Sequence, residues 1–228
     1  MSKLFDLNSP VMQAMSRLAD IVFLSFLWFV CCIPVITIGP STTAMYFVAM
    51  KLAQKEEIRV VPTFLKSFKV NFKQGIVLTL IFLIVGAVLV VDVLYFASPA
   101  LSDGTGVSLM QGIFLALCVW ALCIMFYTFP LQAQFYNPIG RTLRNAAVLS
   151  MQKVLDTIIV FFWNALPLIF VYVSVKLTSS FELVVRMAPI WVLVVPGTIA
   201  VLCAKRFVKI FDPYLNPKKE EETEEEEA

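Results

Sequence analysis

Five stretches of this chain contain no charged residue over 18 or more consecutive positions. They cover residues 21–50, 74–91, 104–140, 157–175 and 187–204. About 20 helical residues cross the roughly 30 Å hydrocarbon core of a bilayer. Because every backbone amide in lipid must be paired within the protein, stretches of this length predict membrane-crossing helices. The strands of a membrane barrel would alternate polar and apolar residues, and these stretches do not.

The first stretch is too long for one untilted crossing, since its 30 residues would make a helix of about 45 Å. Pro34, Gly39 and Pro40 interrupt it, and both residue types break helices or mark their ends. They predict one helix over residues 21–33 and a second, shorter helix over residues 40–54. We therefore expect an all-α, polytopic transmembrane helical bundle with six crossings. A single crossing by the first stretch would give five instead.

The other four stretches each predict one further crossing. These crossings are expected at about residues 75–95, 107–129, 154–175 and 187–203. Pro130 is expected to end the helix over residues 107–129, because proline lacks the amide that would continue it. The polar residues that follow predict a connection at the membrane edge.

A basic segment and an acidic tail lie outside the crossings. Residues 141–147 carry two arginines beside apolar positions, which predicts an amphipathic helix at the membrane interface. Seven glutamates in residues 220–227 repel one another and bring no apolar surface to bury. We therefore expect a membrane domain over residues 1–214 and a disordered acidic tail over residues 215–228.

Lysine and arginine are distributed unevenly among the connections between the crossings. Residues 51–73, 131–153 and 205–219 carry 14 of them, whereas residues 93–106 and 176–186 carry two. Short connections rich in basic residues stay in the cytoplasm. The pattern therefore predicts a cytoplasmic C-terminus. Six crossings place the N-terminus in the cytoplasm as well, whereas five place it outside.

The residue types that usually carry catalysis are absent or scattered. The chain has no histidine, which removes the usual neutral-pH base and a common metal ligand. Its five cysteines lie in or beside the apolar stretches, at positions 31, 32, 118, 123 and 203. Packing as small hydrophobic side chains is their ordinary role there, and their spacing is not that of a zinc site. We therefore expect no enzyme, no metal and no cofactor.

A few polar residues near or within the apolar stretches are candidates for a small membrane cavity. Asn164 lies three residues before Pro167, and a proline inside a helix frees a carbonyl group that needs another partner. A kinked helix beside a polar cavity would follow, with Asn164, Tyr127, Gln134 and Asp92 as its candidate residues. Hydrogen bonding between helices is the more common use of such residues. Solvation at a helix end is the corresponding ordinary interpretation of Asp92.

The segment after the second expected helix alternates aromatic and basic residues. Phe64 and Phe68 share a helical face, and Lys66, Lys69 and Lys73 lie beside or opposite it. This pattern is typical of a helix on the cytoplasmic leaflet, where lysines meet anionic headgroups. Nucleic acid or an acidic groove of a partner would suit the same composition. In a chain tethered to the membrane we expect lipid and no nucleic acid.

Several of these segments together resemble a known family. Residues 32–46 read CIPVITIGPSTTAMY, the basic segment contains Phe64 and Phe68, and residues 143–146 read LRNA. Up to about Pro213, the chain resembles the YesL family of bacterial integral membrane proteins. The resemblance implies a small helical protein of the bacterial cytoplasmic membrane, often encoded beside sugar-uptake ABC transporters, sugar-degrading enzymes and two-component regulators. It implies no catalytic or binding residues.

The function expected from the sequence is that of a non-enzymatic accessory or regulatory partner in carbohydrate uptake. The lack of charge in the middle of the crossings and of a catalytic constellation supports such a role, and the resemblance names the process. The expected partners are the lipid bilayer and a component of a sugar ABC transporter or a sensor. The alternative is a small transporter or channel for a neutral solute, with a path along Asn164, Tyr127 and Gln134.

Overall fold

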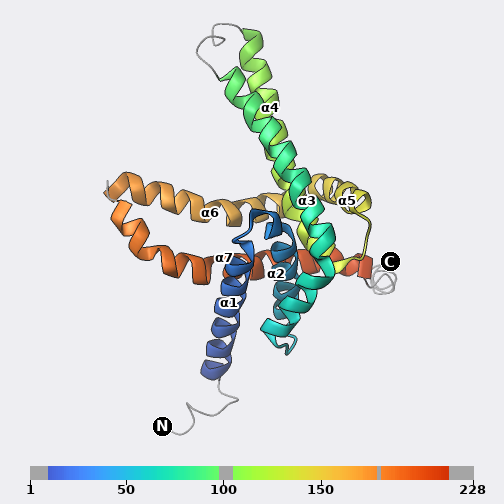
Figure 1. Ribbon diagram of the computed structural model, residues 1–228, viewed down its shortest axis with the longest axis vertical. Coiled ribbons are helices and arrows are strands. Elements are labelled where there is room, and N and C mark those ends of the chain that lie inside the picture. The colour runs from blue at the N-terminus through green and yellow to red at the C-terminus, as the bar shows by residue number, and fades with distance from the viewer. Residues whose placement is uncertain (1–9, 98–104, 179–180, 216–228) are drawn as a thin grey trace, which may run out of the picture.

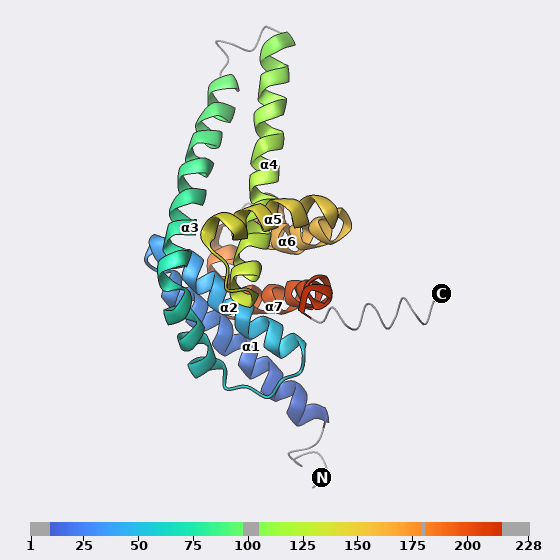
Figure 2. The ribbon, with the colours of Figure 1, turned by 90° about the vertical axis from the view of Figure 1, so that its right-hand side faces the viewer.

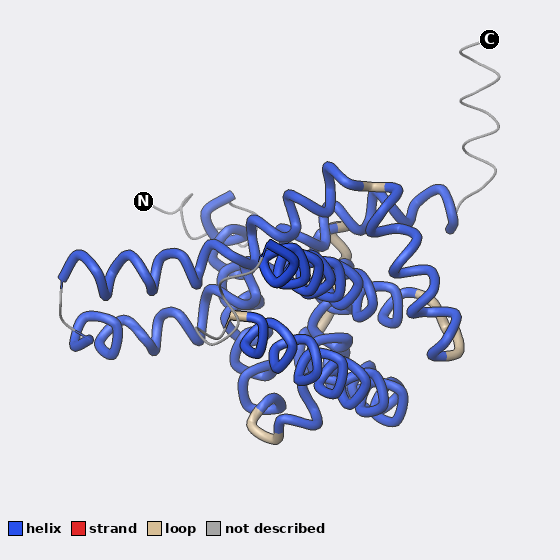
Figure 3. The backbone as a smooth tube through the Cα atoms, turned by 90° about the horizontal axis from the view of Figure 1, so that it is seen from above, coloured by secondary structure: helices blue, strands red, loops and turns tan. Residues whose placement is uncertain are grey.

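The computed structural model describes residues 10–97, 105–178 and 181–215, and these residues are almost entirely helical (Figure 1). In chain order the elements are α1 (Pro10–Cys32), the short 3₁₀ helix η2 (Val35–Thr37), α2 (Ile38–Ala53), α3 (Val60–Phe96), α4 (Thr105–Gln134), α5 (Ile139–Gln152), α6 (Val154–Thr178) and α7 (Phe181–Leu215). Figure 3 shows helices and short loops, and no strand, over the described residues. The expected all-α fold is confirmed. The expected acidic tail lies outside the described residues, apart from Leu215.

Five helices of the described residues are long and apolar enough to cross a bilayer, namely α1, α3, α4, α6 and α7. The chain is therefore a multi-pass membrane protein, as its uncharged stretches predict. The crossing expected over residues 40–54 corresponds to α2. With 16 residues, α2 rises only about 24 Å and is not among the five. The remaining helix, α5, is the amphipathic helix expected beside the crossings.

Two helical hairpins project from a central body (Figures 1 and 2). The outer parts of α3 and α4, residues 80–96 and 105–122, run side by side and form the α3–α4 arm. Residues 158–178 of α6 and 181–195 of α7 form the α6–α7 arm. The two arms point in different directions, and α1 extends from the body on the side opposite the α3–α4 arm.

The helix α2 lies at the centre of the body. It packs against α1, α3, α4 and α7, and ten of its 16 residues are buried. Tyr46 of α2 and Tyr127 of α4 both meet the ring of Phe207 on α7 edge to face, with ring centroids 5.7 and 5.3 Å apart. Such contacts between aromatic rings add to the gain from burial. The centre of α2 therefore faces protein rather than lipid.

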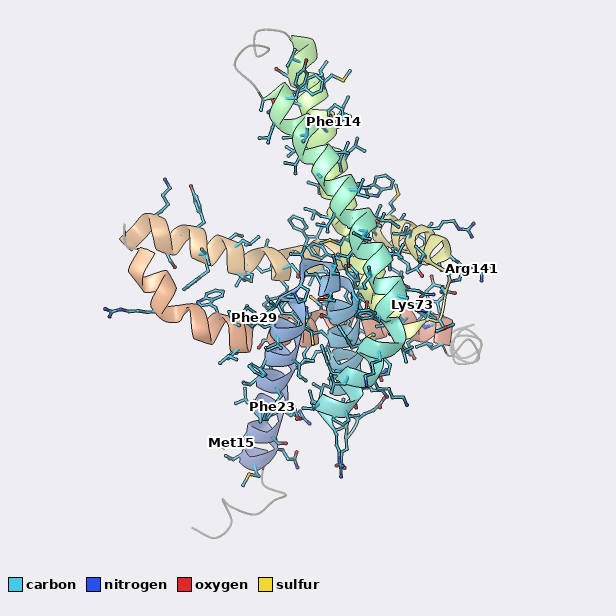
Figure 4. The ribbon with its side chains drawn as sticks, in the orientation of Figure 1. Met15, Phe23, Phe29, Lys73, Phe114 and Arg141 are labelled. Carbon is cyan, nitrogen blue, oxygen red and sulfur yellow. The ribbon has the colours of Figure 1, made fainter. Side chains whose placement is uncertain are left out.

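The arms differ from the body because their apolar side chains are exposed. Ile84 on α3, Leu109 on α4 and Leu168 on α6 are all well exposed. Within the α3–α4 arm, Phe96 and Phe114 stack with ring centroids 5.4 Å apart and tie the two helices together (Figure 4). Exposed apolar surface of this extent is unfavourable in water, at about 25 cal/mol per Å². Lipid tails accept it without that cost.

The prediction that Pro130 ends the crossing over residues 107–129 is wrong. Pro130 lies inside α4, which continues to Gln134. A proline inside a membrane helix is tolerated where neighbouring groups and packing compensate for the missing backbone bond. Pro130 is buried among the helices of the body, which gives it such surroundings. The connection to α5 accordingly begins later than expected, at Phe135.

Candidate functional site

A cavity of about 620 Å³ lies between α1, α2, α6 and α7. Its lining includes Trp28 of α1, Tyr46 of α2, Asn164 and Pro167 of α6 and Trp191 of α7. Cavities of about 300–1,000 Å³ with apolar walls and a few polar groups are typical of small-molecule sites. No charged side chain lines this one among the described residues. Its chemistry therefore fits an apolar or uncharged occupant.

Asn164 joins α6 to α7 at the edge of this cavity. Its amide nitrogen donates to the carbonyl oxygen of Val160 at 2.8 Å and lies 3.7 Å from the sulfur of Cys203 on α7. Pro167 follows three residues later inside the same helix. The polar side chain that the sequence places beside a proline is thus bonded to its own helix and to a neighbour. This arrangement serves helix packing.

The contact between α1 and α7 depends on one serine and one glycine. The amide nitrogen of Gly197 donates to the hydroxyl oxygen of Ser25 at 2.9 Å, and that hydroxyl donates to the carbonyl oxygen of Ile21 at 3.0 Å. A Cβ atom at Gly197 would lie 2.5 Å from the Ser25 hydroxyl oxygen and 2.6 Å from the Ile21 carbonyl oxygen. Only glycine lets the two backbones approach this closely.

A second close contact of this kind joins α2 to α3. The amide nitrogen of Gly39 donates to the hydroxyl oxygen of Thr79 at 2.9 Å. A Cβ atom at Gly75 would lie 2.6 Å from the backbone nitrogen of Pro40. The first turn of α2 is therefore pressed against the backbone of α3. Small residues at helix contacts are the usual means of such packing in membranes.

Two further polar contacts connect α4 to its neighbours. The hydroxyl oxygens of Thr157 on α6 and Tyr127 lie 3.0 Å apart and share a hydrogen bond. The side-chain amide of Gln132 donates to the side-chain carbonyl of Gln74 on α3 at 2.8 Å. These groups are buried or partly buried. Their hydrogen bonds pair polar groups that would otherwise be costly inside the protein, whereas the side-chain carbonyl oxygen of Gln132 is buried without a partner among the described residues.

The four residues predicted to line a polar cavity lie in different places. Asn164 lines the cavity described above, whereas Tyr127 is fully buried in the body beside Thr157. Gln134 lines another cavity, of about 500 Å³, between α2, α3 and α4. Asp92 lies near the outer end of the α3–α4 arm. The structure therefore does not bring these four side chains to one site.

The segment predicted to lie on the membrane surface is the first part of α3. Lys66, Lys69 and Lys73 are exposed on it. Phe64 is fully buried in the body, so it is not available to a membrane surface. Phe68 is partly buried and stacks on Phe64 with ring centroids 6.3 Å apart. These two aromatic side chains do not reach the headgroups because their face of α3 packs against the protein.

Sequence reasoning missed most of the groups around Asn164. Trp28, Tyr46 and Cys203 come from three helices, and no spacing rule connects positions so far apart in the chain. One signal was present in the hydroxyl-rich segment that begins α2. Thr42 in that segment accepts a hydrogen bond from the indole nitrogen of Trp28 at 3.2 Å.

Part of the chain matches a protein-family model. No curated protein and no solved structure matches the chain at a significant level. Residues 21–93, from the middle of α1 through most of α3, include the contacts of Gly39 and Gly75 with their neighbours. This segment matches the model of the family DUF624, whose description is "Protein of unknown function".

Proposed function

We propose that this protein is a non-enzymatic accessory or regulatory partner of a carbohydrate-uptake system in the bacterial cytoplasmic membrane. The observation that carries the proposal is that two pairs of polar side chains from different helices bond one another within the body. Tyr127 bonds Thr157, and Gln132 bonds Gln74. Groups used for helix packing in this way are not available for chemistry. A chain built like this acts through its surfaces.

The exposed apolar side chains of the two arms support a role in binding other membrane proteins. Ile84 on the α3–α4 arm and Leu168 on the α6–α7 arm are 65% and 74% exposed. Helices of separate subunits associate in membranes through van der Waals packing of such surfaces. The proposed partners are membrane-spanning components of a sugar transporter or of a sensor. The carbohydrate process itself rests on the resemblance to the YesL family.

Co-purification tests the proposal. The full chain with a C-terminal affinity tag is isolated in mild detergent from cells grown on the sugar whose uptake genes lie beside its own. We expect a transporter or sensor component to co-purify in near-stoichiometric amount. Ile84→Trp and Leu168→Trp enlarge one exposed side chain on each arm, and the variant on the docking arm should lose the partner. Co-purification of no transporter or sensor component would contradict the proposal.

A small transporter or channel for a neutral solute is the second candidate. The cavity of about 620 Å³ beside Asn164 favours it, because no charged side chain lines that cavity among the described residues. Purified protein in liposomes should then conduct an uncharged sugar, and Asn164→Leu should change the rate. Solute flux equal to that of empty liposomes would remove this candidate and leave the accessory role standing.

A further inference from the structure

The corner between α1 and α2 is apolar and exposed. The side chains of Ile33, Val35 and Ile36 are 71%, 55% and 49% exposed. No charged residue occurs between Asp20 and Lys51. Turns in water are usually built from polar residues and glycine, and a contiguous exposed apolar patch is unfavourable there. The corner therefore has the surface of a membrane-embedded segment although its backbone makes a turn.

Backbone polar groups at the corner find partners within the protein. The hydroxyl oxygen of Thr37 lies 2.6 Å from the carbonyl oxygen of Cys31 and 2.7 Å from that of Pro34, so it can donate to either. The Thr37 amide donates to the Pro34 carbonyl at 2.9 Å, and the Gly39 amide donates to the Thr79 hydroxyl at the same distance. Unpaired backbone groups are costly in hydrocarbon, and these hydrogen bonds reduce their number at the corner.

The neighbouring helix α3 extends well past this corner. The corner end of α2 is held to α3 at Thr79, and α3 continues for 17 residues beyond that position to Phe96, about 25 Å. On the other side, Ile33 and Trp191 line the same cavity, but the α6–α7 arm that carries Trp191 points in a different direction from α3 (Figure 1). The returning helix α2 itself rises only about 24 Å, less than the roughly 30 Å of the hydrocarbon core.

Basic residues indicate from which side the hairpin enters. Lys73 precedes Thr79 by six residues on α3, about 9 Å along the helix axis. Lys55 and Arg59 follow α2, and Arg17 lies in the first half of α1. Basic residues near the ends of membrane segments favour the cytoplasmic side. The corner thus lies a short distance into the hydrocarbon from the cytoplasmic face.

We propose that α1 and α2 form a re-entrant hairpin that enters the bilayer from the cytoplasm and turns back at residues 33–36. The exposed apolar side chains of this corner contact the acyl chains of the inner leaflet. Phe23 and Phe29 are exposed along α1 and extend this lipid-facing surface toward the corner (Figure 4). The long helices α3 and α4 then cross the bilayer beside it. The first turns of α1 and the last turns of α7 share the cytoplasmic side.

Labelling of single added cysteines tests the hairpin. Ile36→Cys, Lys55→Cys and Ala97→Cys are made in the full chain, and the native protein with its five cysteines sets the background. Each variant is reconstituted in vesicles and treated with a membrane-impermeant maleimide from one side at a time. We expect Lys55→Cys to react only from the cytoplasmic side and Ala97→Cys only from the outside. Ile36→Cys should react from neither side, yet fully after denaturation.

Reaction of Ile36→Cys from the outside would show a complete crossing and overturn the proposal, as would its reaction from the cytoplasmic side. A nitroxide attached at the same position separates lipid from protein as the occupant. We expect high accessibility to oxygen and low accessibility to a polar nickel complex, because oxygen concentrates in hydrocarbon. Low accessibility to both reagents would mean that a second copy or another protein covers the corner, which also contradicts the proposal.

Discussion

Gly39 and Thr79 lie 40 positions apart in the sequence, and the amide nitrogen of Gly39 donates to the hydroxyl oxygen of Thr79 at 2.9 Å. That hydroxyl in turn donates to the carbonyl oxygen of Gly75 at 2.8 Å. Together the three residues connect the first turn of α2 to the middle of α3. They fix the position of the α1–α2 corner within the body.

Gly39→Ala should destabilise the protein by about 1–3 kcal/mol, the usual cost of overpacking a well-packed core. The added Cβ would collide with the Thr79 hydroxyl and with the carbonyl oxygen of Gly75, which belongs to backbone. Thermal unfolding in detergent measures the effect. Gly112→Ala on α4 is the matched control, since nothing lies within 4 Å of its added Cβ. Equal unfolding midpoints for the two variants would show that α2 and α3 are not packed this closely.

Thr79→Val should cost more than Thr79→Ser. Valine keeps the shape of threonine but removes the hydroxyl, so the buried Gly39 amide loses its acceptor. Leaving a buried donor without a partner costs about 1–3 kcal/mol. Serine retains the hydroxyl and should recover most of that loss. Unfolding of both variants by denaturant gives the comparison, and a serine variant as unstable as the valine variant would contradict a role for this hydrogen bond.

A similar asymmetry is expected at Tyr127 and Thr157. In Tyr127→Phe, the Thr157 hydroxyl retains the carbonyl oxygens of Ser150 and Lys153, which lie 3.0 and 2.9 Å away. In Thr157→Val, the fully buried Tyr127 hydroxyl loses this partner. Thr157→Val should therefore destabilise by about 1–3 kcal/mol and Tyr127→Phe by less. The reverse order in thermal unfolding would count against this assignment.

The sequence predicted the helical class and the membrane class because both depend on local properties. The length of an uncharged stretch such as residues 157–175 is sufficient to predict a membrane helix. The continuation of α4 through Pro130 was not predictable in this way. Whether a proline ends a helix depends on what surrounds it, and the burial of Pro130 is a property of the folded body.

The cavity was less predictable than the helices. Asn164 was recognisable because a polar residue beside Pro167 stands out in an apolar helix. Its contact with Cys203 was not, since a cysteine among apolar residues gives no signal about its neighbour. The burial of Phe64 was also not predictable from the sequence. The pattern of aromatic and basic residues identified a face of α3, but the face is covered by protein.

Asn164→Leu separates the two functional candidates. Interhelical hydrogen bonds in membrane proteins contribute about 0.6 kcal/mol on average and about 1.7 kcal/mol at most, so only a small loss of stability is expected. In an accessory protein, sugar uptake by cells carrying this variant should equal that of the native strain. Uptake that falls several-fold while the protein remains folded and abundant would instead favour a solute path beside Asn164.

The central claim is that the long apolar helices are held in a lipid bilayer, and extraction of membranes from expressing cells tests it most directly. The fraction of the chain that remains in the membrane pellet after washing with alkaline carbonate is compared with the fraction released by detergent. We predict that essentially all of it stays in the pellet after carbonate and is released by detergent as a folded, monodisperse species. Recovery of the folded chain in the carbonate supernatant, monodisperse without detergent, would contradict the account.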